Sequence, residues 1–113
     1  MKQNTFLITT VLTLAVGSVF LNAAPVISEF MAANDTTLAD EDGDFSDWIE
    51  IHNPDGREVD LDGYFLTDKA TNLVKWRIPA VTIPAGGYLV IFASDKDRPN
   101  QEAALHTNFQ LTQ

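Results

Sequence analysis

The sequence lacks cysteine, has few basic residues and contains no apolar run long enough to span a bilayer. Without Cys among its 113 residues, the chain has no disulfide framework, no Cys-ligated zinc or iron–sulfur centre, no thiol nucleophile and no lipid-modified N-terminal Cys. Seven basic residues stand against 16 acidic ones, for a formal net charge of -9. Because binding to phosphates or anionic lipid needs clustered Lys and Arg, nucleic acid is not an expected partner.

Catalytic sequence signatures are also missing. No serine lies in a G-x-S-x-G context, and no P-loop or dinucleotide-binding glycine pattern is present. The 45% apolar content and seven Phe argue against a disordered chain. The length allows one domain at most.

The N-terminal segment has the pattern of an export signal. Lys2 precedes the apolar run FLITTVLTLAV, and small residues follow at Asn22-Ala23-Ala24-Pro25. This order predicts a helical signal peptide over residues 1–24, cleaved after Ala23 or Ala24. An uncleaved membrane anchor is the alternative, but the apolar stretch is shorter than the roughly 20 residues that a spanning helix needs. We therefore expect a periplasmic, cell-surface or extracellular domain over residues 25–113, without membrane contact after cleavage.

The rest of the chain reads as short strands between Gly- and Pro-rich turns, with no amphipathic helix. Hydrophobic residues alternate with polar ones, or form short apolar runs, in several segments, which favours an antiparallel β-sandwich or barrel. The predicted strands are 26–31, 48–53, 59–62, 64–67, 73–78, 81–83, 88–92 and 105–111.

Six segments in order resemble the lamin-tail domain of exported bacterial proteins. They are VISEFMAAN, LADEDGDFSDWIEIHN, VDLDGYFLTD, KWRIP, IPAGGYLVIFASDKDR and LHTNFQL. The resemblance implies an immunoglobulin-like antiparallel β-sandwich that is not an enzyme and that serves for interaction or attachment. Such domains usually continue past the last segment, so we expect an incomplete domain. Its strand around Leu105–Leu111 would then have an unpaired edge, through which the chain could self-associate.

The acid-rich run DEDGDFSD offers the sharpest local signal. Calcium takes six to eight oxygen ligands, and alternating Asp on an exposed loop suits it. The EF-hand pattern does not fit, because Phe45 stands where that pattern needs Gly and Ile51 where it needs Glu. A different calcium loop and a solvated acidic loop remain as alternatives. The candidate ligands are Asp40, Asp42, Asp44 and Asp47.

Other reactive side chains favour structural roles. Glu29 and Glu50 lie in predicted strands, and nothing in the sequence places them across a cleft as a glycosidase needs. His52 and His106 show no metal-ligand spacing. Trp48 and Trp76 could form a sugar platform, but Trp on an alternating strand favours packing.

Two functions follow from these patterns. The first is a non-catalytic exported interaction or attachment module whose partner is a protein or a cell surface. Its acidic loop, residues 35–47, would form the contact or the calcium surface. The second is an N-terminal accessory domain of a larger secreted hydrolase or cell-surface enzyme, whose catalytic part would lie beyond Gln113.

Overall fold

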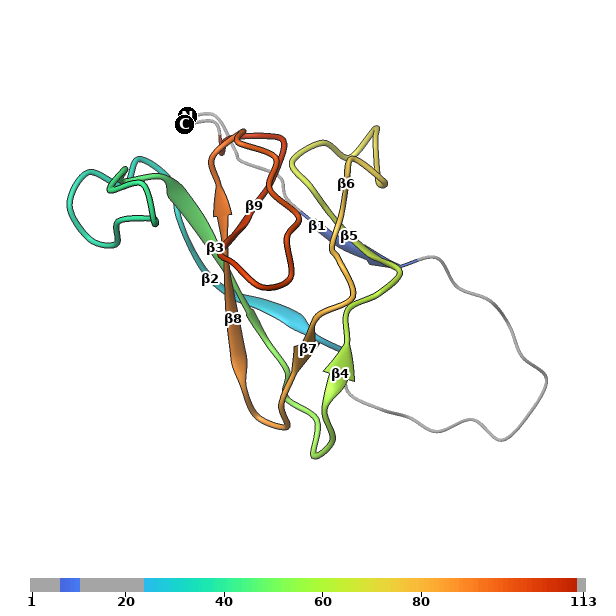
Figure 1. Ribbon diagram of the computed structural model, residues 1–113. Coiled ribbons are helices and arrows are strands. Elements are labelled where there is room, and N and C mark those ends of the chain that lie inside the picture. Colours follow the sequence, from blue (N-terminus) through green and yellow to red (C-terminus); the bar gives the residue numbers. More distant parts are fainter. Residues whose placement is uncertain (1–6, 11–23, 112–113) are drawn as a thin grey trace.

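The computed structural model describes residues 7–10 and 24–111. Within these residues the chain forms strands and no helix, so no described helix could cross a membrane. Figure 1 shows two layers that enclose the core. The strands are β1 (Leu7–Thr10), β2 (Val26–Met31), β3 (Asp47–His52), β4 (Val59–Asp60), β5 (Tyr64–Thr67), β6 (Trp76–Arg77), β7 (Thr82–Ile83), β8 (Tyr88–Ala93) and β9 (Leu105–His106).

One layer is a four-stranded sheet in the order β2-β3-β8-β9. Its two central strands, β3 and β8, pair along six residues, from Asp47 opposite Ala93 to His52 opposite Tyr88. Successive side chains of a strand point to opposite faces. Ile49 and Ile51 therefore enter the core while Glu50 between them faces out, as the alternation in the sequence predicts.

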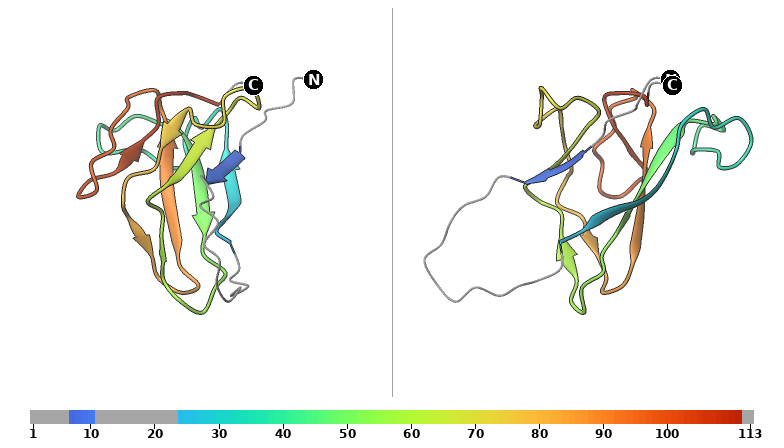
Figure 2. Two further views of the ribbon diagram at one scale, coloured as in Figure 1. Left: turned by 90° about the vertical axis from the view of Figure 1, so that its right-hand side faces the viewer. Right: turned by 180° about the vertical axis from the view of Figure 1, so that it is seen from behind.

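The other layer consists of the sheet β1-β5-β6 and the short pair β4-β7. Backbone hydrogen bonds continue from one to the other, because Leu61 N–H donates to Val81 O and Ile78 N–H donates to Tyr64 O. Figure 2 shows this layer facing the four-stranded sheet from two further directions. The buried side chains between the layers are Ile49, Ile51, Leu61, Leu66, Trp76, Ile78, Ile83, Ile91, Ala93, Leu105, Phe109 and Leu111.

The predicted all-β sandwich is confirmed, with one exception to its antiparallel pairing. β9 runs parallel to β8, with Leu105 opposite Ile91 and His106 opposite Phe92. Both Trp side chains are buried, and the predicted core packing is confirmed for Trp76, whereas Trp48 lies outside the core cluster.

The last predicted strand is shorter than expected, and its edge is not open. Only Leu105–His106 form β9. On the side away from β8, His106 N–H donates to Arg98 O and Arg98 N–H donates to His106 O. The predicted unpaired edge is therefore wrong at this strand, because the chain folds its own loop against it.

The predicted export segment contributes a strand. Leu7–Thr10 form β1, which pairs antiparallel with β5. These four residues form a strand and not the predicted helix, because Ile and Thr are β-branched and an edge of β5 is available to them. The rest of the predicted signal peptide, residues 1–6 and 11–23, lies outside the described residues.

Candidate functional site

Two buried polar side chains hold the acidic loop, residues 35–47, in one shape. The side-chain amide of Asn34 donates to Leu38 O at 2.7 Å and to Ser46 O at 3.0 Å, and its Oδ1 accepts from Thr37 N–H. Asn34 thus joins the two ends of the loop. Figure 1 shows the loop standing away from the sandwich between the end of β2 and the start of β3.

Asp40 organises the tip of the loop. Its Oδ1 accepts from the backbone N–H groups of Asp42 and Asp44, each at 3.0 Å, and its Oδ2 accepts from the Ser46 hydroxyl at 2.9 Å. Gly43 completes the turn with a φ of 81°, in the left-handed region that glycine adopts without strain. The Asp40 side chain is fully buried. Its carboxylate is therefore a structural acceptor for the loop backbone.

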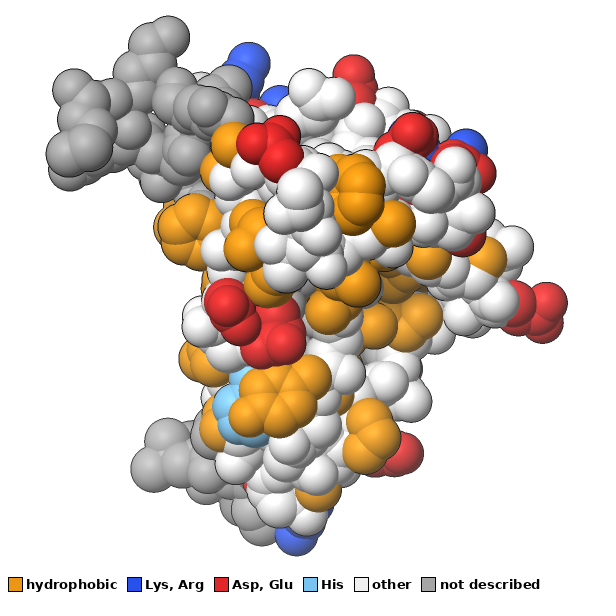
Figure 3. Space-filling view, turned by 90° about the vertical axis from the view of Figure 1, so that its left-hand side faces the viewer, with side chains coloured by type: hydrophobic (Ala, Val, Ile, Leu, Met, Phe, Trp, Pro, Cys, Tyr) orange, Lys and Arg blue, Asp and Glu red, His pale blue; other side chains and the backbone are white. Residues whose placement is uncertain are grey.

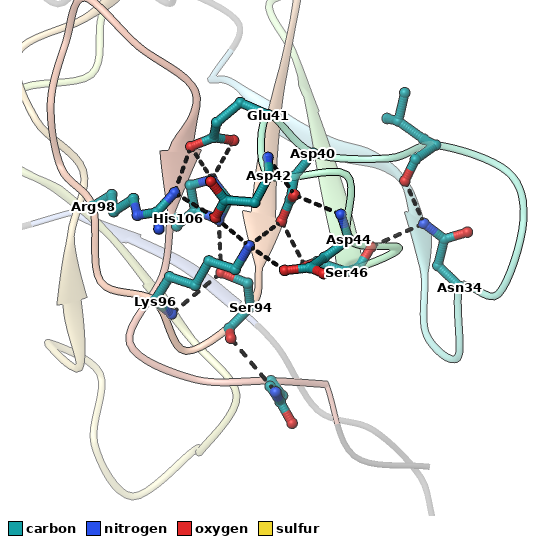
Figure 4. A network of polar contacts seen from close by, with 12 residues as sticks. Asn34, Asp40, Glu41, Asp42, Asp44, Ser46, Ser94, Lys96, Arg98 and His106 are labelled. Atoms are coloured by element: carbon teal, nitrogen blue, oxygen red, sulfur yellow. Dashed lines mark hydrogen bonds and ion pairs between the residues drawn. The ribbon is translucent and has the colours of Figure 1, made fainter.

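Lys96 places its ammonium among three carboxylates of the loop. Its Nζ donates to Oδ2 of Asp40 at 2.6 Å, of Asp42 at 2.8 Å and of Asp44 at 2.9 Å (Figure 4). On either side of Lys96, Asp95 and Asp97 adopt left-handed backbone angles, which are uncommon for residues other than glycine. The segment after β8 is thus shaped so that Lys96 points into the acidic loop.

A second set of contacts fixes Glu41 beside this group. The fully buried His106 lies with Nε2 2.8 Å from Glu41 Oε2 and with Nδ1 2.7 Å from Ser94 Oγ. A carboxylate only accepts, so Nε2 of His106 donates to Glu41. Arg98 Nη1 donates to Glu41 Oε1 at 2.9 Å and also lies 2.8 Å from Asp42.

These contacts change the acidity of the groups. Burial of the Asp40 carboxyl opposes ionisation, but hydrogen bonds from Lys96, Ser46 and the loop backbone lower its pKa to about 2. Burial acts to lower the pKa of Lys96, yet the three carboxylates raise it above its ordinary value. Hydrogen bonds from Lys96 and Arg98 likewise lower the pKa of Asp42. The loop therefore stays anionic, and Lys96 stays cationic, over the neutral pH range.

Three of the four predicted calcium ligands come together, and the fourth does not join them. Oxygens of Asp40, Asp42 and Asp44 lie within 4.8 Å of one another. Asp47 instead accepts a backbone hydrogen bond from Asn34 at 3.4 Å. The protein's own Lys96 meets the three clustered carboxylates.

Beside the loop lies a hollow of about 420 Å³. Phe45, Ser46 and Asp47 line it from the loop, and Ser94 and Gln110 line it from the sandwich. Phe45 is 47% exposed there. Figure 3 shows acidic and apolar side chains together on the face of the molecule from which the loop stands out.

Sequence reasoning missed Asn34, Lys96 and His106 as members of this site. Lys96 and Arg98 lie in the segment DKDR, and together they are two of the only seven basic residues in the chain. Because basic residues are scarce in this chain, two of them so close together could have been expected to pair with the acid-rich run. Asn34 and His106 gave no such signal.

The other reactive side chains of the sequence stay apart from this site. Glu29 and Glu50 are opposite one another in the β2–β3 register, and the Ser28 hydroxyl donates to Glu50 Oε1 at 2.7 Å. The ring of His52 stacks on Tyr88 at 4.3 Å between centroids, and its Nδ1 lies 3.0 Å from Gly87 O. Glu50 and His52 thus have local partners, which favours the structural interpretation for these two residues.

One comparison with known proteins agrees with this architecture. A search of curated proteins and a search of solved structures each gave no match. A family model described as the lamin tail domain matches residues 21–113. That range includes β2 to β9 and the whole acidic loop. The chain therefore belongs to the lamin tail domain family, whose members are immunoglobulin-like domains.

Proposed function

We propose that this lamin tail domain is a non-catalytic, exported interaction or attachment module that contacts a protein partner through its acidic loop. Immunoglobulin-like domains of this family typically mediate interactions. The observation that carries the proposal is Phe45, a large apolar side chain held out on a loop whose backbone is fixed by Asn34 and Asp40. A rigid loop loses little conformational entropy on binding.

The surface around Phe45 suits a partner with both apolar and basic groups. Aromatic side chains are enriched where proteins bind one another. The adjoining hollow would take a side chain of the partner, and the carboxylate of Asp47 at its wall favours a cationic one, whereas Asp44 there is already paired with Lys96. An anionic surface such as nucleic acid would be repelled.

Site-specific photocrosslinking tests the proposal. A benzophenone amino acid is placed at Phe45 in one protein and at Val74, which is 57% exposed and lies outside this site, in a matched control. In cells that naturally carry the gene, Phe45 should give one defined crosslinked protein that Val74 does not give. The same band from both positions, or none from Phe45, would contradict a contact surface at the loop.

The proposed export predicts where the mature protein begins. The apolar N-terminal segment and the small residues at its end support a cleaved signal, so protein recovered outside the cytoplasm should begin at Ala24 or Pro25. Intact-mass analysis measures this. Protein that begins at Met1 in the membrane fraction would show that the segment is retained as an anchor.

An accessory domain of a larger secreted hydrolase or cell-surface enzyme is the second proposal. It keeps the domain itself non-catalytic, in accordance with its family. The two proposals differ in what the gene encodes after Gln113. An in-frame catalytic domain there supports the hydrolase, and a stop codon or further binding modules support the independent module.

Calcium at the acidic loop is a further part of the proposal. The oxygens of Asp40, Asp42 and Asp44 are close enough to share one ion. The Lys96 ammonium lies among them, so calcium would have to displace it. Calcium should then raise the melting temperature more in Lys96→Met than in the unaltered protein, because binding to the folded state alone stabilises it.

A matched variant makes the calcium test specific. Asp42→Ala added to Lys96→Met should abolish the calcium-dependent increase, whereas Asp35→Ala added to Lys96→Met should not. Magnesium should act more weakly, since it prefers strict octahedral geometry and keeps its waters. Equal melting temperatures in calcium and in chelator for Lys96→Met would overturn the calcium site.

A further inference from the structure

We propose that the outer edge of β5 is a strand-binding site that accepts an extended segment of another polypeptide once Leu7–Thr10 has left it. The inference rests on the proposed export of the protein and deepens it, because it names a second kind of partner. β1 occupies this edge in the described structure, and it comes from the segment that export is proposed to remove. The site would thus become available in the processed protein.

The pairing of β5 shows that this edge accepts a strand. β1 runs antiparallel to it along four residues, from Leu7 opposite Thr67 to Thr10 opposite Tyr64. On its other side β5 pairs with β6 at Phe65 and Leu66, and Tyr64 O accepts from Ile78 N–H. Removal of β1 therefore leaves a row of backbone donors and acceptors without partners, and such an edge is a template for strand addition.

The same strand also covers part of the core. Ile8 is half-buried and packs against the core cluster, opposite the fully buried Leu66. β1 also contacts β2, at the edge of the other layer (Figure 2). A replacement strand therefore needs an apolar β-branched side chain at the position of Ile8 and has no room for proline in the ladder.

Charge favours a different protein over a second copy as the occupant. Every acidic residue of the chain lies in residues 24–111 while Lys2 does not, so this part is more negative than the whole chain with its charge of -9. Two copies would repel one another. Asp62 and Asp68 near the ends of β5 already pair with Arg77 and Lys75, so the negative charge of the whole domain, rather than these two acids, favours a partner segment with basic residues.

A cysteine lock in the full chain tests the site. The chain has no Cys, so Thr9→Cys with Phe65→Cys, an opposed pair in the register, gives one defined disulfide. The probe is a fluorescent peptide Lys-Leu-Ile-Thr-Thr-Lys, and the control peptide has proline in place of isoleucine. The oxidised protein should not bind the probe, and reduction should restore binding.

A second variant opens the edge. Thr9→Pro interrupts β1, and the probe should then bind at least about tenfold tighter than to the unaltered chain, because a tethered strand competes at millimolar effective concentration. Hydrogen exchange at Tyr64–Thr67 should rise in Thr9→Pro and fall again when the probe is added. The proline-containing peptide should bind neither protein.

Each result decides the proposal. Failure of the disulfide to form, or probe binding that is equal in the oxidised and reduced protein, would show that β5 is not the binding edge. Concentration-dependent dimerisation of Thr9→Pro without probe binding would assign the edge to a second copy and overturn the proposed partner. These measurements use purified full-length chain, so they stand whether or not export and the Phe45 contact are confirmed.

Discussion

The ammonium of Lys96 lies 2.6 Å from Oδ2 of Asp40, although the two residues are 56 positions apart in the sequence. This contact joins the acidic loop to the segment after β8. Around it, Asp42 and Asp44 supply two more carboxylates for the same ammonium. Three carboxylates of the most acidic segment thus form ion pairs within the protein, and only the other acidic side chains of the loop are available to a partner.

Removal of this ammonium should destabilise the protein. Lys96→Met leaves the buried Asp40 carboxylate without its cation, and a lost hydrogen bond to a charged group costs roughly 1 to 3 kcal/mol. The free energy of unfolding in urea measures the change. Lys69→Met is the matched control, because Lys69 is exposed, and it should change the stability by less than about 0.5 kcal/mol. Equal effects of the two variants would contradict the role of Lys96.

The acidic loop should lose stability in strong acid. The pKa of Asp40 is about 2 in the folded protein against an ordinary value of 3.8. A carboxyl with a lowered folded pKa stabilises the protein above its unfolded pKa, and this contribution disappears as the pH falls through the folded pKa. We expect a loss of about 1 to 2 kcal/mol between pH 5 and pH 2 from this group.

The control for the pH effect is a pair of variants. Asp40→Asn should remove that part of the acid dependence of urea unfolding, while Asp35→Asn, on the exposed start of the loop, should leave it unchanged. Lys96 acts in the opposite direction. Its pKa is raised, so its contribution is complete below its ordinary pKa and disappears as the pH rises through the folded value.

Asn53 should matter as much as an apolar core residue. It is fully buried, and its side-chain amide donates to Arg57 O at 2.7 Å and to the carbonyls of Ile83 and Pro84 at 3.1 Å. Asn53→Ala removes the amide donor of Arg57 O and Ile83 O, while Pro84 O keeps the Gly87 N–H, and should cost about 2 to 3 kcal/mol. Asn72→Ala, on an exposed loop, serves as the control in the same thermal melts. A small loss from Asn53→Ala would mean that water replaces the amide.

Periodicity predicted the central strands well. The ranges of β2 and β5 match the prediction, β3 is shifted from it by one residue at both ends, and β8 is one residue longer at its C-terminal end. In these strands hydrophobic residues alternate with polar ones or occupy both faces, so the hydrophobic pattern is enough to locate them. The predicted strand 73–78 shortens to Trp76–Arg77, and Leu73 and Val74 are exposed. Apolar content there did not indicate burial. The Thr67 hydroxyl donates to Lys69 O and Asn72 O, so Leu73 follows a hydrogen-bonded loop and does not lie in the strand.

The site was less predictable than the fold. Alternating Asp residues gave oxygen ligands within a few positions, which a local pattern can detect. The same pattern cannot show that Asp40 accepts backbone N–H groups, or that Lys96 and His106 arrive from more than fifty residues away. These partners depend on how β8 and β9 lie beside β3, which is tertiary information. The sequence therefore suggested a metal at a place where the protein supplies its own cation.

The contacts of Ser94, His106 and Glu41 provide the last prediction, because they join a serine, a histidine and a carboxylate as a serine hydrolase triad does, with the two ring nitrogens exchanged. Ser94 Oγ lies 2.7 Å from His106 Nδ1, and His106 Nε2 lies 2.8 Å from Glu41. Two features oppose catalysis. Ser94 is only 9% exposed and accepts the backbone N–H of Lys96 at 3.2 Å, and Arg98 forms an ion pair with Glu41 at 2.9 Å. A nucleophilic serine must be accessible to substrate. Its histidine base also needs a carboxylate that is free to orient the ring and to stabilise its protonated form.

We therefore expect a structural role that two measurements separate from a catalytic one. A fluorophosphonate probe should not label the full chain, and p-nitrophenyl esters should be hydrolysed at the rate of the buffer. Ser94→Ala should lower the free energy of unfolding by about 1 kcal/mol, since a neutral hydrogen bond is lost. His106→Phe should cost more, because it also removes the buried donor of Glu41 and leaves that carboxylate with Arg98 alone. Labelling of the unaltered chain that Ser94→Ala abolishes would instead establish this domain as an enzyme.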